Sequence, residues 1–189
     1  RLATLGFSSA VLPFGEGADR TLNFFARLVT GAPHIRYAGH TDVVPPGRVD
    51  DWRYPPYEAH IADGLLYGRG ACDMKGGIAA FVAAVARQVA AGGVQGSISL
   101  LITGDEEGPA TYGTSKVLEW MQAHDQIPDY CLVGEPTNPR VLGEMVKVGR
   151  RGSLNAKIVV EGTQGHVAYP QRADNPAHRL LAVLEALRA

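Results

Sequence analysis

The sequence has few cysteines, no large excess of either charge and no long apolar run. Its 18 basic and 19 acidic side chains leave a net charge of -1, so composition does not indicate a partner such as nucleic acid or anionic lipid. No stretch approaches the ~18 consecutive apolar residues that a membrane span needs. Two cysteines cannot form a disulfide framework. We therefore expect buried free thiols in a reducing compartment, the cytoplasm.

What the sequence does contain favours a globular protein. Hydrophobic residues make up 46% of its 189 residues, which is enough for a buried core. The first six residues indicate the last turn of a helix that stops at Gly6. There is no initiator Met, and residues 181–189 form a helical pattern without a stop signal. We therefore expect a piece of a longer protein.

Apolar periodicity divides the chain into alternating strands and helices. The predicted strands span residues 22–29, 35–39, 97–103, 130–134, 141–148 and 154–160, with a hairpin over 60–69. The predicted helices span 74–91 and 111–124, and a last helix has Pro176 near its start and Asp174 or Asn175 as its cap. This alternation predicts an α/β fold with a mixed or largely parallel central sheet flanked by helices. Cys72 and Cys131 are both expected to be core residues.

Acidic residues lie at the ends of four successive elements, and one end also carries a histidine. Taken alone, each suggests a surface turn, a helix cap or a solvated loop. Together they are expected to meet at the carboxyl edge of the sheet, where open α/β sheets bind ligands. Clustered carboxylates repel unless a cation neutralises them, and one histidine among carboxylates suits Zn²⁺, Co²⁺ or Mn²⁺. The acidic residues and the histidine at these four ends are His40, Asp42, Asp73, Glu106, Glu107 and Glu135.

Two local patterns suggest how such a site would work. Consecutive side chains diverge, so one of Glu106 and Glu107 can bind metal while the other acts as a base. In His40-Thr-Asp42, the aspartate can form a hydrogen bond with the ring nitrogen of His40 that faces away from the metal.

Five motifs, in order, resemble the di-zinc M20 amidohydrolase family. They are His40-Thr-Asp42-Val-Val-Pro-Pro, Tyr67-Gly-Arg-Gly-Ala-Cys-Asp73-Met-Lys-Gly, Thr103-Gly-Asp-Glu106-Glu107, Val133-Gly-Glu135-Pro and Gly149-Arg-Arg-Gly-Ser. The resemblance implies a zinc-peptidase-like catalytic domain over residues 1–151. It also implies the beginning of an inserted two-layer α/β lid and dimerisation domain over 152–189, with both domains incomplete.

The resemblance implies two Zn²⁺ ions per full-length subunit, with Co²⁺ as a substitute. Asp73 would bridge the ions, His40 and Glu135 would complete one site, and Glu107 would hold the other ion. The family's second site also takes a histidine near the carboxyl terminus, which no remaining position in this sequence matches. This piece is therefore expected to hold its second metal weakly. The resemblance further implies a non-proline cis peptide between Asp73 and Met74.

The other site residues follow from the same resemblance. Glu106 would be the general base and acid, and Asp42 would orient His40. His166 would stabilise the oxyanion across a homodimer formed through the lid. The positions that match those holding substrate carboxylates are Arg150, Ser153 and Tyr169.

Within the family, Gly165-His166-Val-Ala-Tyr169-Pro favours members that hydrolyse the amide of N-succinyl-LL-2,6-diaminopimelate in lysine biosynthesis. The implied partner is this small molecule, with no nucleic acid and no membrane. Two alternatives stay open. One is another deacylase or peptidase with the same metal core, such as an acetylornithine deacetylase-like enzyme. The other is an inactive metal-binding fragment, against which the intact Glu106 argues, since a structural metal needs no base.

Overall fold

The computed structural model describes residues 2–149, 152 and 154–188. They form two compact units, Arg1–Val146 and Lys147–Ala189. Within the described residues, none of the helices combines the length and the apolar character that crossing a membrane requires. The catalytic and lid roles assigned to residues 1–151 and 152–189 stay predictions.

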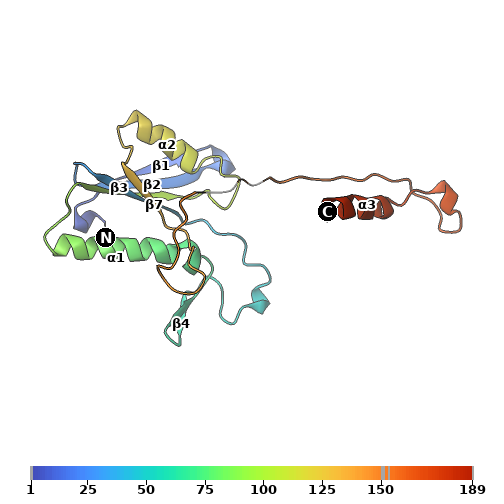
Figure 1. Cartoon of the computed structure of the whole chain (residues 1–189), viewed down its shortest axis with the longest axis horizontal. Coiled ribbons are helices and arrows are strands. Elements are labelled where there is room, and N and C mark those ends of the chain that lie inside the picture. Colours follow the sequence, from blue (N-terminus) through green and yellow to red (C-terminus); the bar gives the residue numbers. More distant parts are fainter. Residues whose placement is uncertain (1, 150–151, 153, 189) are drawn as a thin grey trace. The chain divides into compact units, whose positions relative to one another are not determined.

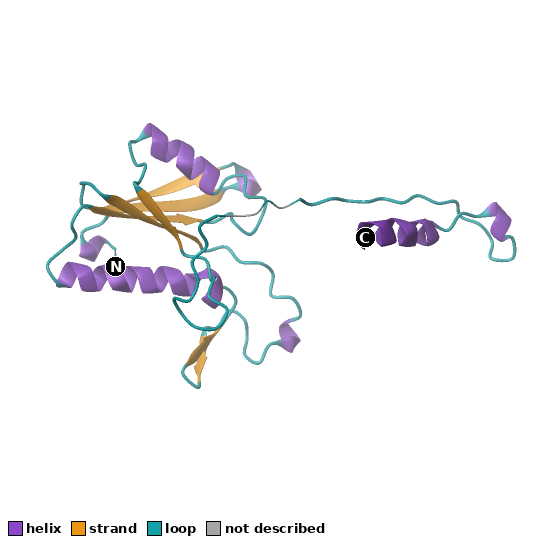
Figure 2. Ribbon diagram, viewed as in Figure 1, coloured by secondary structure: helices purple, strands orange, loops and turns teal. Residues whose placement is uncertain are grey.

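The first unit is built on a five-stranded mixed sheet with the order β1-β2-β6-β3-β7 (Figures 1 and 2). The strands β3, β6 and β7 run parallel to one another. The strand β2 pairs antiparallel with β6, and β1 pairs antiparallel with β2. The bounds are β1 (Ser8–Phe14), β2 (Thr21–Leu28), β3 (His34–His40), β6 (Ser97–Thr103) and β7 (Tyr130–Val133). A separate hairpin, β4 (His60–Ala62) and β5 (Leu65–Tyr67), lies within the predicted range 60–69 and turns at Asp63 and Gly64.

Two helices cover opposite faces of this sheet, α1 (Gly76–Ala90) and α2 (Thr114–Ala123) (Figure 1). Val85 of α1 belongs to a core cluster with Leu28, Tyr37 and Leu100 from the sheet. On the other face, α2 buries Val117 and Met121 against Leu12, Phe25 and Leu101. The predicted α/β class, with a mixed sheet flanked by helices, is confirmed.

The described residues also form short helical turns. The segment η4 (Ala71–Lys75), whose backbone departs from helical angles at Asp73 and Met74, leads directly into α1. The others are 3₁₀ turns, and Gly6 closes the first of them with a left-handed φ of 91°, as its predicted stop role requires. They are η1 (Ala3–Leu5), η2 (Gly17–Asp19), η3 (Val49–Asp51) and η5 (Pro170–Arg172).

The last strand of the sheet differs from the prediction. The sequence predicts a short buried strand over residues 130–134, yet every residue of β7 is exposed. The reason is its edge position: among the described residues β7 pairs only with β3, and the core clusters beneath α1 and α2 draw on the other strands. Cys131 is therefore exposed, and its predicted core position is wrong.

Cys72 is also exposed, which contradicts its predicted core position. It lies in η4, where the core-facing side chain is Met74, with 1% of its surface accessible. Both cysteines are free, as expected. The expectation that they are buried thiols is wrong.

Two predicted strands, over 141–148 and 154–160, are not formed among the described residues. Their apolar side chains stay exposed, including Leu142 at 93% and Val148 at 101%. A strand needs a neighbour to satisfy its backbone N–H and C=O groups, and no described strand pairs with either segment. The strand β1 was not predicted, because Pro13 interrupts its pattern; proline is tolerated there at the sheet edge.

The second unit contains α3 (Pro176–Arg188). Asn175, rather than Asp174, caps it, because its Oδ1 accepts a hydrogen bond from the Ala177 N–H at 3.0 Å. Asp174 instead forms an antiparallel bridge with Thr163 through two backbone hydrogen bonds.

A polar layer lies between the sheet and α2. His34 Nε2 is 2.7 Å from the Ser99 hydroxyl, and Arg36 donates to the same oxygen at 3.0 Å. Burial lowers the pKa of Arg36 to about 10, so the guanidinium stays charged at neutral pH. Burial, followed by the charges of Arg27 and Arg36, lowers the pKa of His34. At neutral pH His34 is therefore uncharged in the folded protein.

We expect His34→Gln to make folding less sensitive to acid. Because the pKa of His34 is lower in the folded state than its ordinary 6.5, the unfolded chain takes up this proton first as the pH falls. The free energy of folding that neutral His34 contributes is complete above pH 6.5, the ordinary pKa of histidine. It is lost as the pH falls through the lower pKa of the folded state. Thermal melts between pH 7.5 and 5 should fall less steeply for His34→Gln than for wild type. An equal slope would contradict this, and the exposed His178→Gln serves as control.

Candidate metal centre

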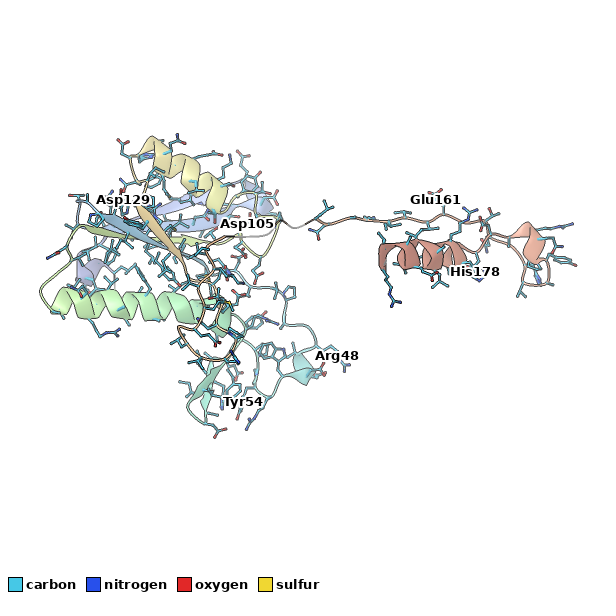
Figure 3. The ribbon with its side chains drawn as sticks, viewed as in Figure 1. Arg48, Tyr54, Asp105, Asp129, Glu161 and His178 are labelled. Carbon is cyan, nitrogen blue, oxygen red and sulfur yellow. The ribbon has the colours of Figure 1, made fainter. Side chains whose placement is uncertain are left out.

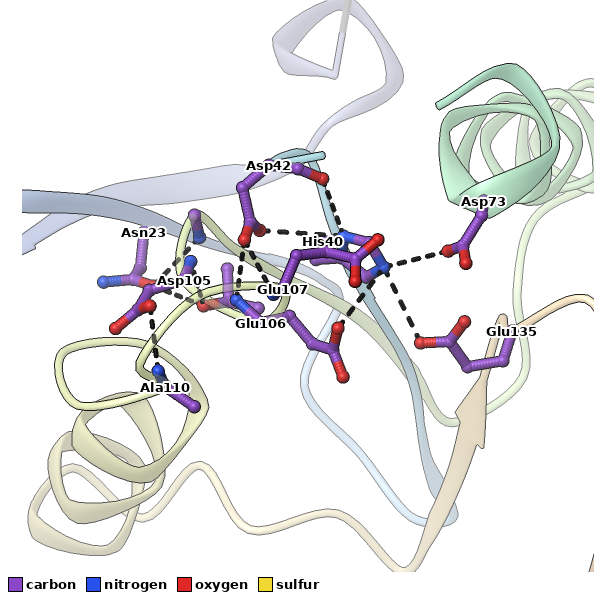
Figure 4. Close-up of polar contacts among 11 residues, drawn as sticks. Asn23, His40, Asp42, Asp73, Asp105, Glu106, Glu107, Ala110 and Glu135 are labelled. Carbon is purple, nitrogen blue, oxygen red and sulfur yellow. Dashed lines mark hydrogen bonds and ion pairs between the residues drawn. The ribbon is translucent and has the colours of Figure 1, made fainter. Parts of the chain in front are cut away.

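The ends of the parallel strands bring the predicted site residues together (Figure 4). His40 is the last residue of β3, the pair Glu106 and Glu107 follows β6, and Glu135 follows β7. Asp73 reaches the same place from η4. Parallel strands have their carboxyl ends at one edge of a sheet, which explains the convergence of residues far apart in sequence.

His40 lies at the centre of this cluster and is 1% exposed. Its Nε2 is 3.1 Å from Asp73 Oδ1, 3.7 Å from Glu135 Oε1 and 3.8 Å from Glu106 Oε2. Its Nδ1 lies 3.0 Å from the backbone carbonyl oxygen of Asp42 and 3.6 Å from Asp42 Oδ1. One ring nitrogen therefore faces the carboxylate cluster and the other faces Asp42.

Two overlapping groups of side chains could each hold a metal ion. One contains His40, Asp73 and Glu135, and the other contains His40, Glu106 and Glu107. Within each group the ligand atoms lie within 4.8 Å of one another. His40 is common to both groups.

The charges of this cluster perturb its pKa values. Burial by itself would lower the pKa of His40, but the Asp42 carbonyl and the carboxylates of Glu106 and Glu135 outweigh it, so the pKa is raised. Burial, and then the Asp73 carboxylate, raise the pKa of Glu135. Both shifts have the direction expected where several carboxylates share a site. The cluster therefore favours uptake of positive charge.

A divalent cation fits this donor set. The Asp42 carbonyl can only accept a hydrogen bond, so it favours a proton on His40 Nδ1, and in the neutral ring the Nε2 lone pair then faces Asp73 Oδ1 at 3.1 Å. A lone pair facing anionic oxygens is unfavourable unless a proton or a metal cation lies between them, and a metal ion can contact several of these oxygens at once. One imidazole nitrogen with carboxylate oxygens is a zinc-type ligand set, and a second hydrogen bond orienting the imidazole is typical of metal-bound histidines.

Asp42 also contacts the Glu106–Glu107 turn. Its Oδ2 accepts hydrogen bonds from the Glu106 N–H at 2.9 Å and the Glu107 N–H at 2.8 Å. Its other oxygen, Oδ1, is buried and has no hydrogen-bond partner. Asp42 therefore connects the histidine at the end of β3 to the acidic pair at the end of β6.

Four predicted site residues remain, and all of them belong to residues 147–189. Arg150 and Ser153 are outside the described residues. His166 and Tyr169 are exposed in the second unit, with their ring centroids 5.9 Å apart. Their contact with the cluster and with substrate stays a prediction. The peptide between Asp73 and Met74 is cis, as the family resemblance implies.

One supporting contact was not predicted. Tyr37 is buried and stacks on Phe81 with ring centroids 4.5 Å apart. A Cβ at Gly134 would lie 1.8 Å from the Tyr37 hydroxyl, so only glycine fits directly before Glu135. Burial, and then the charge of Glu135, raise the pKa of Tyr37. The glycine within Val133-Gly-Glu135 was the available signal.

We expect Gly134→Ala to displace Glu135 and weaken metal binding. Tyr37 is enclosed, so the added methyl group must shift the backbone, and overpacking of this kind costs ~1–3 kcal/mol. Zinc affinity, measured by equilibrium dialysis, should fall by at least ~10-fold, the lower end for a lost supporting contact. Gly31→Ala is the control, because the atom nearest to its added Cβ would lie 3.7 Å away, an ordinary van der Waals distance. Unchanged zinc affinity would contradict the assignment of Glu135 as a ligand.

Comparisons with known proteins agree with this geometry. The sequence profile of peptidase family M20/M25/M40 matches residues 37–189. The chain is 68% identical over 189 residues to the succinyl-diaminopimelate desuccinylase of Gluconacetobacter diazotrophicus, covering 100% of this chain and 49% of that protein. It is 56% identical over 188 residues to the protein of the same name from Gluconobacter oxydans, again covering 100% and 49%. The chain thus spans about half the length of these curated relatives.

Solved structures share the fold. Human carnosine dipeptidase 1 is 29% identical, with a TM-score of 0.60 over 70% of this chain and 30% of that one. An M20 family metallo-carboxypeptidase from Sulfolobus solfataricus has a TM-score of 0.55 at 21% identity, over 66% and 28%, which shows the fold alone. With a family profile that covers most of its length and a histidine–carboxylate cluster at the end of its parallel strands, the chain belongs to peptidase family M20/M25/M40.

Proposed function

We propose that the full-length protein carrying this chain hydrolyses the amide of N-succinyl-LL-2,6-diaminopimelate to succinate and LL-2,6-diaminopimelate. The observation that supports this most is the 68% identity, over the whole chain, to a protein named succinyl-diaminopimelate desuccinylase. The cluster around His40 supplies the residue types that metal-assisted amide hydrolysis needs. The reaction belongs to lysine and diaminopimelate biosynthesis, and we place it in the cytoplasm.

The proposed cofactor is zinc, with two ions per full-length subunit and Co²⁺ as a substitute. His40, Asp73 and Glu135 would hold one ion, with Asp73 shared and Glu107 holding the other. When bound, zinc polarises the substrate carbonyl and lowers the pKa of coordinated water to ~7. The carboxylates at this edge of the sheet support this assignment, since they would otherwise repel one another.

Glu106 would move the proton in this reaction. Its carboxylate lies beside the cluster, with Oε2 3.8 Å from His40 Nε2, and its backbone is held by Asp42. In this position it takes a proton from the attacking water and returns it to the departing amine nitrogen, so that one residue serves as base and then as acid. The new C–O bond of succinate forms first and gives an oxyanion on the former carbonyl oxygen, and the amide C–N bond breaks as that oxyanion collapses and the nitrogen takes the proton from Glu106.

The second unit would supply substrate recognition. We propose that residues 1–151 supply the metal ligands and Glu106, and that His166 stabilises the oxyanion across a homodimer formed through residues 152–189. Arg150 suits a substrate carboxylate because its planar guanidinium binds two oxygens at once. The remaining proposed substrate contacts are Ser153 and Tyr169.

A second candidate is dipeptide hydrolysis with the same metal core. It is supported by the match to human carnosine dipeptidase 1 at 29% identity over 70% of this chain. The relatives named as desuccinylases are far more similar, which favours the succinylated substrate.

Side-by-side turnover tests these candidates. The zinc-loaded full-length protein is assayed with N-succinyl-LL-2,6-diaminopimelate, with acetylated amino acids including acetylornithine, and with dipeptides. The proposal predicts the highest kcat/KM for the succinylated substrate. A preference for an acetylated substrate or a dipeptide would overturn the substrate assignment. Loss of all turnover in chelator-treated enzyme, with recovery on adding Zn²⁺, would support the metal assignment, and turnover that survives chelation would overturn it.

A further inference from the structure

The turn that carries Glu106 and Glu107 is held on its far side by a buried polar network. Asp105 is 8% exposed, and its carboxylate accepts the Ala110 N–H at 3.0 Å and the Tyr112 N–H at 2.9 Å. Its own N–H donates to the Thr103 hydroxyl at 3.3 Å. Asp105 therefore bridges the end of β6 and the loop leading toward α2.

Asn23 of β2 completes this network and is 1% exposed. Its Oδ1 accepts the Thr103 hydroxyl at 2.8 Å and the Gly104 N–H at 3.4 Å. Its Nδ2 donates to the Tyr112 carbonyl at 2.9 Å and to the Leu12 carbonyl at 3.3 Å. Both ends of the loop 104–112 are thus tied to the same asparagine.

The network and the metal cluster meet at the same turn, as Figure 4 shows. Asp105 accepts hydrogen bonds on one side of it, while Asp42 accepts the N–H groups of Glu106 and Glu107 on the other. Gly113 has no room for a side chain, because a Cβ there would lie 2.4 Å from the Asp105 carbonyl oxygen. The backbone of the turn that carries the two glutamates is therefore held by hydrogen bonds on both sides.

We propose that Asp105, supported by Asn23, is a positioning residue that sets the geometry of the Glu106–Glu107 pair for metal binding and proton transfer. This inference deepens the proposed function and rests on it. Asp105 contacts neither substrate nor metal in this role. It fixes where the two neighbouring carboxylates lie, as buried hydrogen bonds beyond the ligands do at metal sites.

The test compares Asp105→Asn with Asp129→Asn in the full-length protein. Asp129 also accepts a backbone N–H, from His34 at 2.7 Å, but lies at the other end of the sheet (Figure 3). Asn at position 105 keeps the side-chain shape but turns an NH₂ group toward an N–H donor. The probe is Co²⁺ alone, titrated into metal-free protein, with the visible absorption spectrum recorded, and thermal melting followed in parallel.

We expect Asp105→Asn to change the Co²⁺ spectrum, to weaken Co²⁺ binding ~10–100-fold, and to lower kcat more than it raises KM. Asp129→Asn should lower the melting temperature while the spectrum and affinity stay as in wild type. If Asp105→Asn lowers only the melting temperature, the residue is structural and the proposal is overturned.

Two further comparisons keep this result decisive. If Asp105→Asn does not fold, Thr103→Val removes a hydroxyl of the same network and is judged by the same two Co²⁺ readouts. Failure of the proposed substrate would appear as a lack of turnover in wild type. The Co²⁺ spectrum and affinity do not depend on that substrate, so they decide the positioning role separately.

Discussion

Glu106→Gln is expected to keep its metals and to lose most turnover. The amide is nearly isosteric with the carboxylate but cannot take a proton at neutral pH. General acid–base catalysis contributes ~10²–10⁴-fold, so kcat of the full-length enzyme should fall by about that factor while KM changes little. Steady-state kinetics together with metal analysis of the purified variant measure both parts.

Two comparisons make this result specific. Glu119→Gln alters an exposed glutamate of α2 that pairs with Lys116, and it should leave kcat unchanged. Glu107→Gln should lose metal rather than proton transfer. Near wild-type turnover in Glu106→Gln, combined with no turnover in Glu107→Gln that still holds both metals, would show that the roles of the two residues are reversed.

His40→Ala should have the largest effect on metal binding. His40 belongs to both candidate groups of described residues, and it is the only member of either group that offers a nitrogen ligand. Figure 4 shows its Nε2 facing the carboxylates. Losing a partner that only supports a ligand already weakens metal binding ~10–100-fold, so losing the ligand itself should exceed ~100-fold. Equilibrium dialysis with Zn²⁺ measures this change.

His178→Ala is the matched control for this variant, because it removes an exposed histidine from the second unit. Its Zn²⁺ affinity should equal that of wild type. Because the His40 ring fills a buried position, its removal can also affect folding. Circular dichroism is therefore used to establish that His40→Ala is folded before its zinc affinity is compared. Tight zinc binding by folded His40→Ala would contradict the metal centre proposed here.

Much of the fold follows from local patterns. The apolar runs at 35–39 and 97–103 predict central strands, and the structure extends each by little or nothing, to His34–His40 and Ser97–Thr103. Residues beyond 140 have similar apolar patterns but form no described strand, because a strand also needs a neighbour. The edge strand β1 was missed because a local pattern does not reveal that Pro13 lies where no ladder bond is needed.

The site shows the same division between local and distant information. Convergence of His40, the Glu106–Glu107 pair and Glu135 follows from their positions at strand ends. Contacts such as Asn23 with Thr103 or Tyr37 with Gly134 join residues far apart in sequence, without any local pattern. The sequence pattern assigns no role to Asp105, which the structure shows to be buried and hydrogen-bonded. Helices that cover the sheet bury such polar groups, which then need hydrogen-bond partners. Only the folded structure shows which residues supply them.

The separate origins of the cluster residues link metal binding to folding. They come from the ends of β3, β6 and β7 and from η4, so the unfolded chain does not hold them together. A cation bound only by the folded state stabilises it by ~2.7 kcal/mol when its free concentration is 100-fold above Kd. The ion would then act as a reversible cross-link between strand ends, and chelation would lower the unfolding temperature as well as the activity.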